Sequence, residues 1–406
     1  MISYTEARRM VAEVAVRTLG GRAPTHEKVA LEAALGRVLA ERLDADRDAP
    51  PFDRSTRDGF AVRAADVASV PATLALVGEI RAGAEFTGAV RPGECVQIMT
   101  GAAVPRGADA VVMIEHTEPQ GGAVVVTRSV AAGANVVPRG SEAKAGDALL
   151  AAGMRIGYAE ISIAAQFGHA HVAVFARPRV AILSTGDEVV PVAATPGAFQ
   201  IRNSNSFSLA AQVTLAGGAA LPVGNAADDS AVLRRKIEEG LAADALVLTG
   251  GVSMGKYDLV EAVLGELGAE FYFDGVAIRP GRPAVFGVCQ GKPVLGLPGN
   301  PVSTMVTFEL LGVPLVDVLS GAAPRPLPLV KARARHAVRQ KAALTHFLPA
   351  EMSWENGEAQ VAEVAWQGSG DVAALARANC FLVVPETKLE FAAGEWVDVL
   401  LRRDRL

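Results

Sequence analysis

Cysteine is scarce in this chain of 406 residues. Its three cysteines, Cys95, Cys289 and Cys380, lie far apart and form no Cys-x-x-Cys pair. A disulfide framework or a thiolate zinc site needs cysteines that are numerous or closely spaced. The sequence therefore predicts neither feature, and a reducing cytoplasm fits it best.

Export signals and long apolar runs are also missing. The first residues, MISYTEARRM, lack the basic start, apolar stretch and small-residue cleavage site of a secretory signal. Half of the residues are hydrophobic, but Gly, Pro or charged residues interrupt every apolar run before the roughly 18 residues needed to span a bilayer. We expect a cytoplasmic protein without membrane contact, whose apolar excess forms core and subunit interface.

Basic charge is not in excess either. The formal net charge is -5, and no run of Lys and Arg is interleaved with aromatic residues. Nucleic-acid binding draws on a basic surface that attracts phosphates over a distance. We therefore expect no nucleic-acid partner, and any anion that binds must be held by local groups.

The length is too great for one hydrophobic core, so several domains are expected. Ser3 followed by Glu6 resembles a capping box and predicts a helix through about Leu19. A second helix is expected over residues 26–43. Residues 1–44 together with 141–177 are predicted to form a helical linker domain.

Residues 45–140 contain short β-rich runs such as CVQIMTG and AVVVTRS, which Gly and Pro turns separate. They predict a small all-β domain. In residues 178–325, apolar strands alternate with helical segments, which favours a parallel sheet with helices on both faces. Residues 326–406, after the prolines of AAPRPLPLV, contain short strands typical of a small barrel or sandwich.

The predicted fold class is thus multidomain α/β. A central parallel-type sheet domain flanked by helices is joined to an all-β domain, a helical linker domain and a C-terminal β-barrel domain. In an open α/β sheet, ligands bind beyond the carboxyl ends of the strands. The loops that follow the strands VAILS, ALVLTGG and PVLGLPG should therefore meet at one crevice.

The first of these loops, Ser184–Glu188, offers hydroxyls from Ser184 and Thr185, a flexible Gly186 and two adjacent carboxylates. Solvated turn carboxylates are the alternative interpretation, because Asp and Gly are common in turns. The second loop, Gly250–Asp258, nearly spells the phosphate-binding pattern GxxxxGK[ST].

Tyr257 stands where a nucleotide P-loop has the Ser or Thr that ligates Mg²⁺. We therefore predict an anion-binding glycine loop rather than a true P-loop. Asp258, with Glu261 three residues later, also fits a capping box. A carboxylate has enough lone pairs to serve as both cap and metal ligand.

The third loop places Asn300 as a helix N-cap and Pro301 at the first helical position. Free N–H groups at such a start, with the Ser303 hydroxyl, favour an oxyanion, although a helix start needs no ligand. Just upstream, Arg279 and Arg282 flank a Pro-Gly turn and supply two cations, unless they form only a solvated basic loop.

These motifs, with others in the same order along the whole chain, resemble the molybdopterin molybdotransferase family, which includes bacterial MoeA and the E domain of gephyrin. The further matching segments are Asp58–Val62, Met99–Gly101, Gly107–Val112, Thr249–Ser253, Gly296–Ser303, Gly368–Gly370, Leu375 and Ala378-Asn379. Several long motifs in order are far more specific than any one of them.

The resemblance implies an enzyme that joins molybdate to the dithiolene of adenylylated molybdopterin and releases AMP, with Mg²⁺ as its cofactor. It also implies a homodimer whose cleft lies between the sheet domain of one subunit and the β domain of the other. Transient contacts with molybdopterin adenylyltransferase and with recipient molybdoenzymes are expected as well.

The resemblance also implies roles for particular residues. The residues expected to be catalytic are Asp58, Thr100, Glu188, Asp228 and Asp258. The last three of these are the expected Mg²⁺ ligands, although Asp229 competes with Asp228 as ligand or helix cap. The residues expected to bind substrate are Ser184, Thr185, Gly186, Gly250, Gly251, Ser253, Arg279, Arg282, Pro298, Pro301 and Ser303, with Arg279, Arg282 and Ser303 holding molybdate.

A cation among these acids has an electrostatic rationale. Two unit charges 4 Å apart repel by about 4 kcal/mol at an effective dielectric constant near 20. Carboxylates facing phosphate and molybdate therefore need a divalent cation between them, and Mg²⁺ binds through few carboxylates plus phosphate oxygens.

Three departures from the family pattern stand out. Arg279 and Arg282 stand where the family commonly has Lys. The change keeps the positive charge but replaces a compact ammonium group with a planar guanidinium that has several N–H donors. Glu142 stands where many members have Asp. The arginines that often flank the position of Phe347 are missing, and we expect His346 to compensate in part.

Two other functions remain as alternatives. The gephyrin branch uses this fold as a scaffold for receptor peptides, and the glycine loop permits a phosphate-handling ATPase. A tungsten-inserting paralogue is a further possibility within the family, because tungstate and molybdate have nearly the same size and charge. No residue here separates the two metals.

Overall fold

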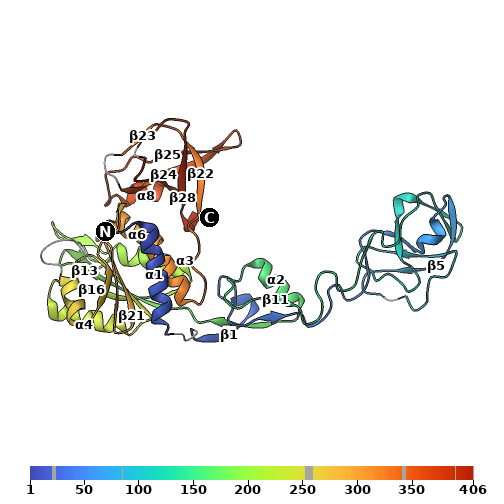
Figure 1. Cartoon of the computed structure of the whole chain (residues 1–406), viewed down its shortest axis with the longest axis horizontal. Coiled ribbons are helices and arrows are strands. Elements are labelled where there is room, and N and C mark those ends of the chain that lie inside the picture. Colours follow the sequence, from blue (N-terminus) through green and yellow to red (C-terminus); the bar gives the residue numbers. More distant parts are fainter. Residues whose placement is uncertain (21–23, 85, 252–258, 341–343, 389, 406) are drawn as a thin grey trace.

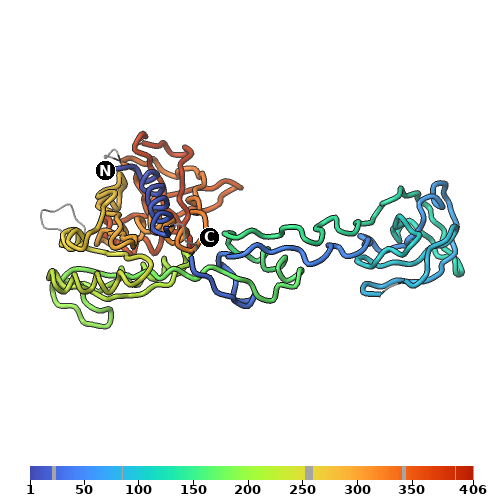
Figure 2. The backbone as a smooth tube through the Cα atoms, turned by 60° about the horizontal axis from the view of Figure 1, so that its bottom comes forward, coloured from blue at the N-terminus to red at the C-terminus, as the bar shows by residue number. Residues whose placement is uncertain are grey.

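The computed structural model describes residues 1–20, 24–84, 86–251, 259–340, 344–388 and 390–405. The α/β domain and the C-terminal domain lie against each other, and a long arm extends from them (Figure 1). The arm consists of the linker domain and, at its far end, the β domain. Figure 2 shows the same separation from another side.

A six-stranded sheet forms the centre of the α/β domain. Its strands, in order across the sheet, are β16 (Ala219–Ala226), β13 (Arg179–Thr185), β17 (Ala245–Thr249), β21 (Lys292–Leu297), β20 (Val285–Cys289) and β18 (Glu270–Phe273). The first four are mutually parallel, and the last two are antiparallel to their neighbours.

The turn between β20 and β21 explains the antiparallel edge. Gln290 and Gly291 join the two strands, with φ angles of 50° and 76°. Two residues of positive φ form the hairpin turn whose twist matches its strands. Parallel strands need a much longer connection. The predicted parallel sheet therefore holds for four strands only.

Helices cover both faces of this sheet. On one face lie α1 (Tyr4–Thr18), α3 (Asn205–Ala216), α6 (Pro301–Thr307) and α7 (Val313–Leu319), and on the other lie α4 (Ser230–Leu241) and α5 (Leu259–Glu266). Strand β13 alternates between the two cores, because Val180 packs on the first face and Ala181 on the second.

The predicted N-terminal helix is present, and the Ser3 hydroxyl accepts a hydrogen bond from the Glu6 N–H. Its buried residues, among them Val11 and Val14, pack in the core of the α/β domain beside α7. The division of the chain into domains stays a proposal. This packing favours assigning residues 4–18 to the α/β domain rather than to the linker domain.

The helix predicted for residues 26–43 is wrong. Strand β1 (His26–Ala30) pairs with β12 (His171–Phe175), and β2 (Leu43–Asp44) pairs with β11 (Ala148–Leu150). A short 3-10 turn and Gly36, with a φ of 74°, lie between β1 and β2. The partner strands come more than 100 residues later, so local helix propensity could not reveal them.

Helix α2 (Tyr158–Gln166) packs beside these paired strands of the linker domain (Figure 1).

The β domain at the end of the arm is built on a six-stranded sheet, as the runs predicted. The strands of the domain are β3 (Arg54–Ser55), β4 (Gly59–Val62), β5 (Ala72–Ile80), β6 (Glu94–Ile98), β7 (Ala110–Met113), β8 (Thr117–Gln120), β9 (Ala123–Val126) and β10 (Val136–Val137). Strands β3 and β10 form a separate pair, and the other six form the sheet.

The C-terminal domain is a closed five-stranded barrel, the first of the two predicted alternatives. Its strands, in order around the barrel, are β24 (Thr345–Glu355), β25 (Glu358–Glu363), β22 (Leu329–Ala334), β28 (Trp396–Leu401) and β26 (Cys380–Val384), which pairs back with β24. Strand β19 (Ile278–Arg279) of the α/β domain adds to β24. This addition joins the two domains through backbone hydrogen bonds.

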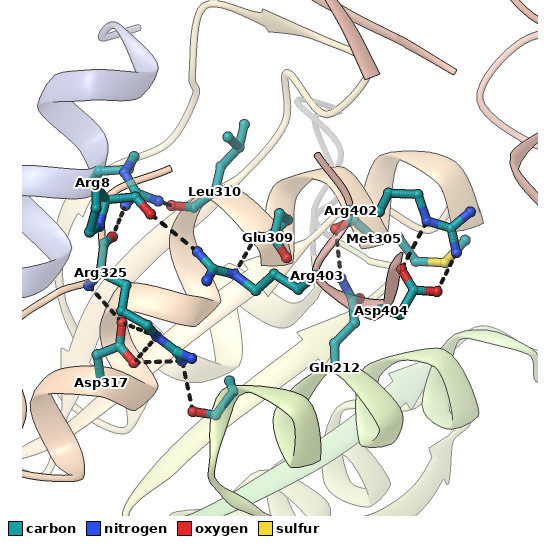
Figure 3. Close-up of polar contacts among 12 residues, drawn as sticks. Arg8, Gln212, Met305, Glu309, Leu310, Asp317, Arg325, Arg402, Arg403 and Asp404 are labelled. Atoms are coloured by element: carbon teal, nitrogen blue, oxygen red, sulfur yellow. Dashed lines mark hydrogen bonds and ion pairs between the residues drawn. The ribbon is translucent and has the colours of Figure 1, made fainter. Parts of the chain in front are cut away.

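One described helical stretch, Pro301–Leu319, is long and apolar enough to cross a membrane, but 94% of its most apolar window is buried in the protein. A π-turn over Phe308–Gly312 interrupts it. Pro314 has no N–H for the Leu310 carbonyl four residues earlier. Instead, Arg8 donates to that carbonyl at 2.6 Å (Figure 3). A side chain of α1 thus supplies a hydrogen-bond donor at the interruption of the core helix.

Asp317, on α7, is the polar anchor between the domains. Its carboxylate is fully buried and accepts from Arg155 of the linker domain at 3.0 Å. Arg325, in the segment that leads to the barrel, donates to it at 2.9 Å from Nε (Figure 3). Arg155 also donates to the Gly36 carbonyl of the linker domain. One carboxylate therefore holds the base of the arm and the start of the barrel.

We predict that Asp317→Asn lowers the free energy of unfolding by about 3–5 kcal/mol, because two arginines lose their buried counter-charge. Urea unfolding followed by circular dichroism measures the change. The control is Asp398→Asn, whose carboxylate pairs with Lys331 at an exposed site and whose loss should cost less than about 1 kcal/mol. Equal effects of the two substitutions would refute the anchoring role.

Candidate functional site

A cleft of about 710 Å³ opens at the carboxyl ends of β13, β17 and β21. The three predicted loops do meet there. The predicted site residues that line it are Ser184, Thr185, Gly186, Glu188, Asp228, Gly250, Gly251, Pro298 and Pro301. The convergence follows from topology, because the carboxyl ends of parallel neighbours share one edge of the sheet.

The loop after β13 is held in a tight shape. Gly186 has a φ of 126°, a backbone conformation that residues with a side chain rarely adopt, so glycine is favoured there. The Glu188 carboxylate lies over it, with an oxygen 2.6 Å from where a Cβ atom would be. The Ser184 hydroxyl is buried, 3.2 Å from Asn203 Oδ1 and 2.8 Å from the Ser206 hydroxyl. Asn225 donates to the Gly186 carbonyl from the neighbouring strand. Ser184 therefore holds the cleft wall together.

Asp228 and Asp229 have separate tasks. The Asp229 carboxylate caps α4 by accepting from the Val232 N–H at 2.9 Å. Asp228 contributes its backbone N–H to the Asp187 carboxylate at 3.0 Å, and its side chain lines the cleft. The cap is thus Asp229, which leaves the Asp228 carboxylate available at the site.

The wall formed by these acids favours a cation. Burial raises the pKa of the Asp228 carboxyl above its usual range, and the negative charges of Asp187 and Glu188 raise it further. Besides burial, therefore, the carboxylates of Asp187 and Glu188 each repel that of Asp228. A bound cation relieves such repulsion, so Glu188 and Asp228 fit a divalent cation that also binds phosphate oxygens.

The third expected ligand, Asp258, and the expected substrate residue Ser253 lie outside the described residues. Within the described ranges, no group of three or more Asp, Glu, His or Cys side chains is arranged to hold a metal ion. The described part of the site therefore supplies Glu188 and Asp228 from the predicted ligand set.

The glycines after β17 lie directly against the first loop. Gly250 and Gly251 both have positive φ, and a Cβ atom on either would come within 3.0 Å of the Thr185 hydroxyl oxygen. The Gly250 N–H donates to the Leu297 carbonyl at the end of β21. Glycine is required here because the loops approach through their backbones.

The third loop begins α6 as predicted, with Asn300 at the N-cap position and Pro301 in the first turn, but the Asn300 side chain makes no capping hydrogen bond. The Thr304 hydroxyl donates to the Pro298 carbonyl instead. The Val302 N–H donates to the Ser369 carbonyl of the C-terminal domain. Gly370 and Val372 of that domain also line the cleft, which gives the barrel domain a place at the site.

Three family models match successive parts of the chain. Residues 2–168 match the MoeA N-terminal region (domain I and II), 181–318 match a probable molybdopterin binding domain, and 331–401 match the MoeA C-terminal region (domain IV). The molybdopterin molybdenumtransferase of Bacillus subtilis is 36% identical over 388 residues, 93% of this chain and 90% of its own length. The corresponding protein of Nostoc is 35% identical over 92% of this chain and 88% of its own length.

The chain belongs to the molybdopterin molybdenumtransferase family. The predicted resemblance is confirmed, and with it a transferase of molybdenum cofactor biosynthesis. A crystal structure of the MoeA protein from Pyrococcus horikoshii OT3 has a TM-score of 0.81 at 28% identity and covers 99% of this chain and 100% of its own. Another P. horikoshii MoeA structure has a TM-score of 0.77 at 33% identity, over 99% of each chain.

Two predicted site residues lie far from the cleft within one chain. The Asp58 carboxylate accepts from the N–H and the hydroxyl of Thr100, at 2.6 and 2.8 Å. These two hydrogen bonds hold the pKa of Asp58 below its usual range. The pair is exposed on the β domain, which lies at the opposite end of the molecule from β13 (Figure 1).

The residues expected to hold molybdate lie near the cleft but do not line it. Arg279 and Arg282 are exposed, and Gly281 between them packs so closely on α6 that a Cβ atom would lie 2.2 Å from the Thr307 hydroxyl oxygen. Ser303, on the same helix, is buried. The described cleft reaches this loop at Pro283.

Two of the residues that depart from the family pattern, His346 and Glu142, contact neighbouring parts of the chain. Arg279 pairs in register with His346 of the barrel, and the His346 side chain is buried, so it offers no exposed group to an anion. Glu142 forms an ion pair with Arg54 at 3.0 Å, at the junction between the β domain and the linker domain. Neither residue lines the described cleft.

Sequence reasoning missed the polar segment before α3. Asn205 donates to the Thr249 hydroxyl at 2.8 Å and to the Gly299 carbonyl at 2.7 Å, and so ties two strand-end loops together. Arg202 and Asn203 line the cleft beside it. The run RNSN directly before a predicted helix was the available signal, because Asn and Ser gather at helix starts and turns.

We predict opposite stability effects for the two neighbouring acids. Asp229→Ala should cost about 1 kcal/mol, because α4 loses its cap. Asp228→Asn should leave the thermal midpoint unchanged or raise it, because repulsion with Glu188 and Asp187 is relieved. Thermal unfolding of both variants measures this, and a loss in Asp228→Asn as large as that in Asp229→Ala would show that Asp228 is structural.

Proposed function

We propose that this protein is a molybdopterin molybdotransferase that inserts molybdate into the dithiolene of adenylylated molybdopterin and releases AMP. The observation that carries the proposal is the strand-end cleft, which is lined both by the carboxylates Glu188 and Asp228 and by the glycines Gly250 and Gly251. A phosphate-bearing substrate fits this cleft if a cation lies between its phosphate and the two carboxylates, because the like charges would otherwise repel.

Glu188, Asp228 and Asp258 would hold Mg²⁺, which supplies positive charge between the carboxylates and the phosphate oxygens. The raised pKa of Asp228 is consistent with this assignment, because after burial its further causes are the negative charges of Asp187 and Glu188. Asp229 caps α4 and does not line the described cleft, so this scheme assigns the ligand role to Asp228.

Several groups would orient the substrate anions. The glycines Gly250 and Gly251 allow the backbone to approach phosphate closely, together with Ser253. Arg279, Arg282 and Ser303 would hold molybdate beside α6, and the tight packing of Gly281 on that helix supports their grouping. Pro298 and Pro301 shape the loop that faces the glycines.

The functional unit in this proposal is a homodimer in which the β domain of a second copy closes the cleft. The hydrogen-bonded pair of Asp58 and Thr100 would then act at the partner's site, which explains its exposure in a single chain. On α3, Phe207 and Leu215 are 60% and 51% exposed, as expected of apolar side chains that a second copy covers. The location is the cytoplasm, where the adenylyltransferase and the recipient molybdoenzymes make transient contact.

The decisive experiment combines purified protein with adenylylated molybdopterin, Mg²⁺ and molybdate, and follows AMP release and molybdenum incorporation. We expect the two to be coupled and to require Mg²⁺. Tungstate in place of molybdate compares the two metals. ATP alone is the control, and its turnover without pterin would favour an ATPase. A folded dimer that binds intact substrate without releasing AMP would favour a scaffold.

In the same assay, Asp258→Asn is expected to keep the fold and to weaken Mg²⁺-dependent turnover, because a ligand carboxylate is lost. Circular dichroism checks the fold, and a Mg²⁺ titration locates the defect. Normal turnover at ordinary Mg²⁺ would remove Asp258 from the site.

The shared site predicts complementation between two inactive variants. Subunits with Asp58→Ala and subunits with Asp228→Asn should each be inactive alone. After random reassembly they should recover about a quarter of wild-type activity, since half of the dimers are mixed and each mixed dimer keeps one intact site. Each variant reassembled with itself is the control. A mixture that stays inactive would place both residues in a site made by one chain.

A further inference from the structure

The charges that line the cleft are unevenly distributed. Within the described part of the chain, Glu188 and Asp228 supply negative charge, and Arg202 is the one cationic side chain in the lining. The two arginines expected to bind an anion, Arg279 and Arg282, are not in that lining. Arg202 was not among the residues that the sequence singled out.

A hydrogen bond fixes the Nε atom of Arg202, whereas its terminal Nη atoms are available for a ligand. Arg202 Nε donates to the Ala194 carbonyl at 3.1 Å, and a turn closed by the Ala194 N–H and the Pro191 carbonyl supports that acceptor. Among the described residues, the terminal Nη atoms of Arg202 have no hydrogen-bond or ion-pair partner. The side chain is exposed, so these donors face solvent at the cleft.

Backbone pairing couples Arg202 to the acidic wall. Strands β14 (Val189–Val190) and β15 (Ile201–Arg202) form a short parallel ladder in which Val190 pairs with Arg202. The Ile201 N–H donates to the Glu188 carbonyl at 2.8 Å. Glu188 and Arg202 both line the cleft, and no ion pair within 4.0 Å joins their described side chains.

From this arrangement we infer that Arg202 binds a phosphate group of the pterin substrate, while Glu188 and Asp228 serve the cation on the neighbouring wall. The planar guanidinium offers paired N–H donors that match phosphate oxygens. The inference rests on the proposed function and deepens it, because it assigns the phosphate-bearing end of the substrate to the β14–β15 side of the cleft.

The test compares Arg202→Ala, Arg202→Lys and the control Arg235→Ala, an exposed arginine on α4. Three quantities are measured: the equilibrium affinity for molybdopterin, which carries a phosphate, and the KM and the kcat for AMP release. A phosphate-free pterin serves as the second ligand. Circular dichroism and the urea midpoint confirm that each variant folds.

Loss of a charge-assisted contact should weaken molybdopterin binding by Arg202→Ala about ten- to hundred-fold. KM should rise similarly while kcat changes less than about three-fold, since the contact serves binding before and during reaction alike. Binding of the phosphate-free pterin should be unchanged. Arg202→Lys should recover part of the affinity, and Arg235→Ala should behave as wild type.

Unchanged molybdopterin affinity in Arg202→Ala would overturn the inference. So would equal losses for both pterins, or equal losses in the Ala and Lys variants, because these indicate a structural role. If the wild-type protein binds molybdopterin but releases no AMP, the proposed reaction fails, and the affinity series still decides whether Arg202 binds phosphate.

Discussion

The site depends on the parallel pairing of β13, β17 and β21. These strands end at one edge of the sheet, so loops that are more than 40 residues apart along the chain meet there. Hydrogen bonds from Asn205 to Thr249 and Gly299 then fix the loops against each other. Without this pairing, the glycines and the carboxylates would have no common cleft.

Negative charge is the second constraint on the site. The cleft wall gathers Glu188 and Asp228, with Asp187 close enough to raise the pKa of Asp228. Folding tolerates this repulsion because Asp187 and Glu188 are exposed to solvent and because Asp187 also accepts a hydrogen bond from the Asp228 N–H. In the proposed function, a cation and an anionic substrate together would balance these charges.

A buried carboxylate anchors the arm to the rest of the chain. Asp317 joins the core helix to Arg155 of the linker domain and to Arg325 before the barrel. The β domain, which carries Asp58 and Thr100, lies at the end of that arm, far from the α/β domain of its own chain (Figure 2). In the proposed dimer, this anchor determines how one subunit presents its β domain to the other.

Sequence alone determined the strand-end loops, the glycine positions, the first helix and the family, because these depend on local pattern and on motif order. Tertiary structure decided the rest. Residues 26–43 form strands because their partners lie in distant segments, and Asp229 caps α4 because of where that helix begins. Arg202 reaches the cleft only through β14–β15 pairing. Contacts between residues far apart in sequence leave no local periodicity, so only the folded chain reveals them.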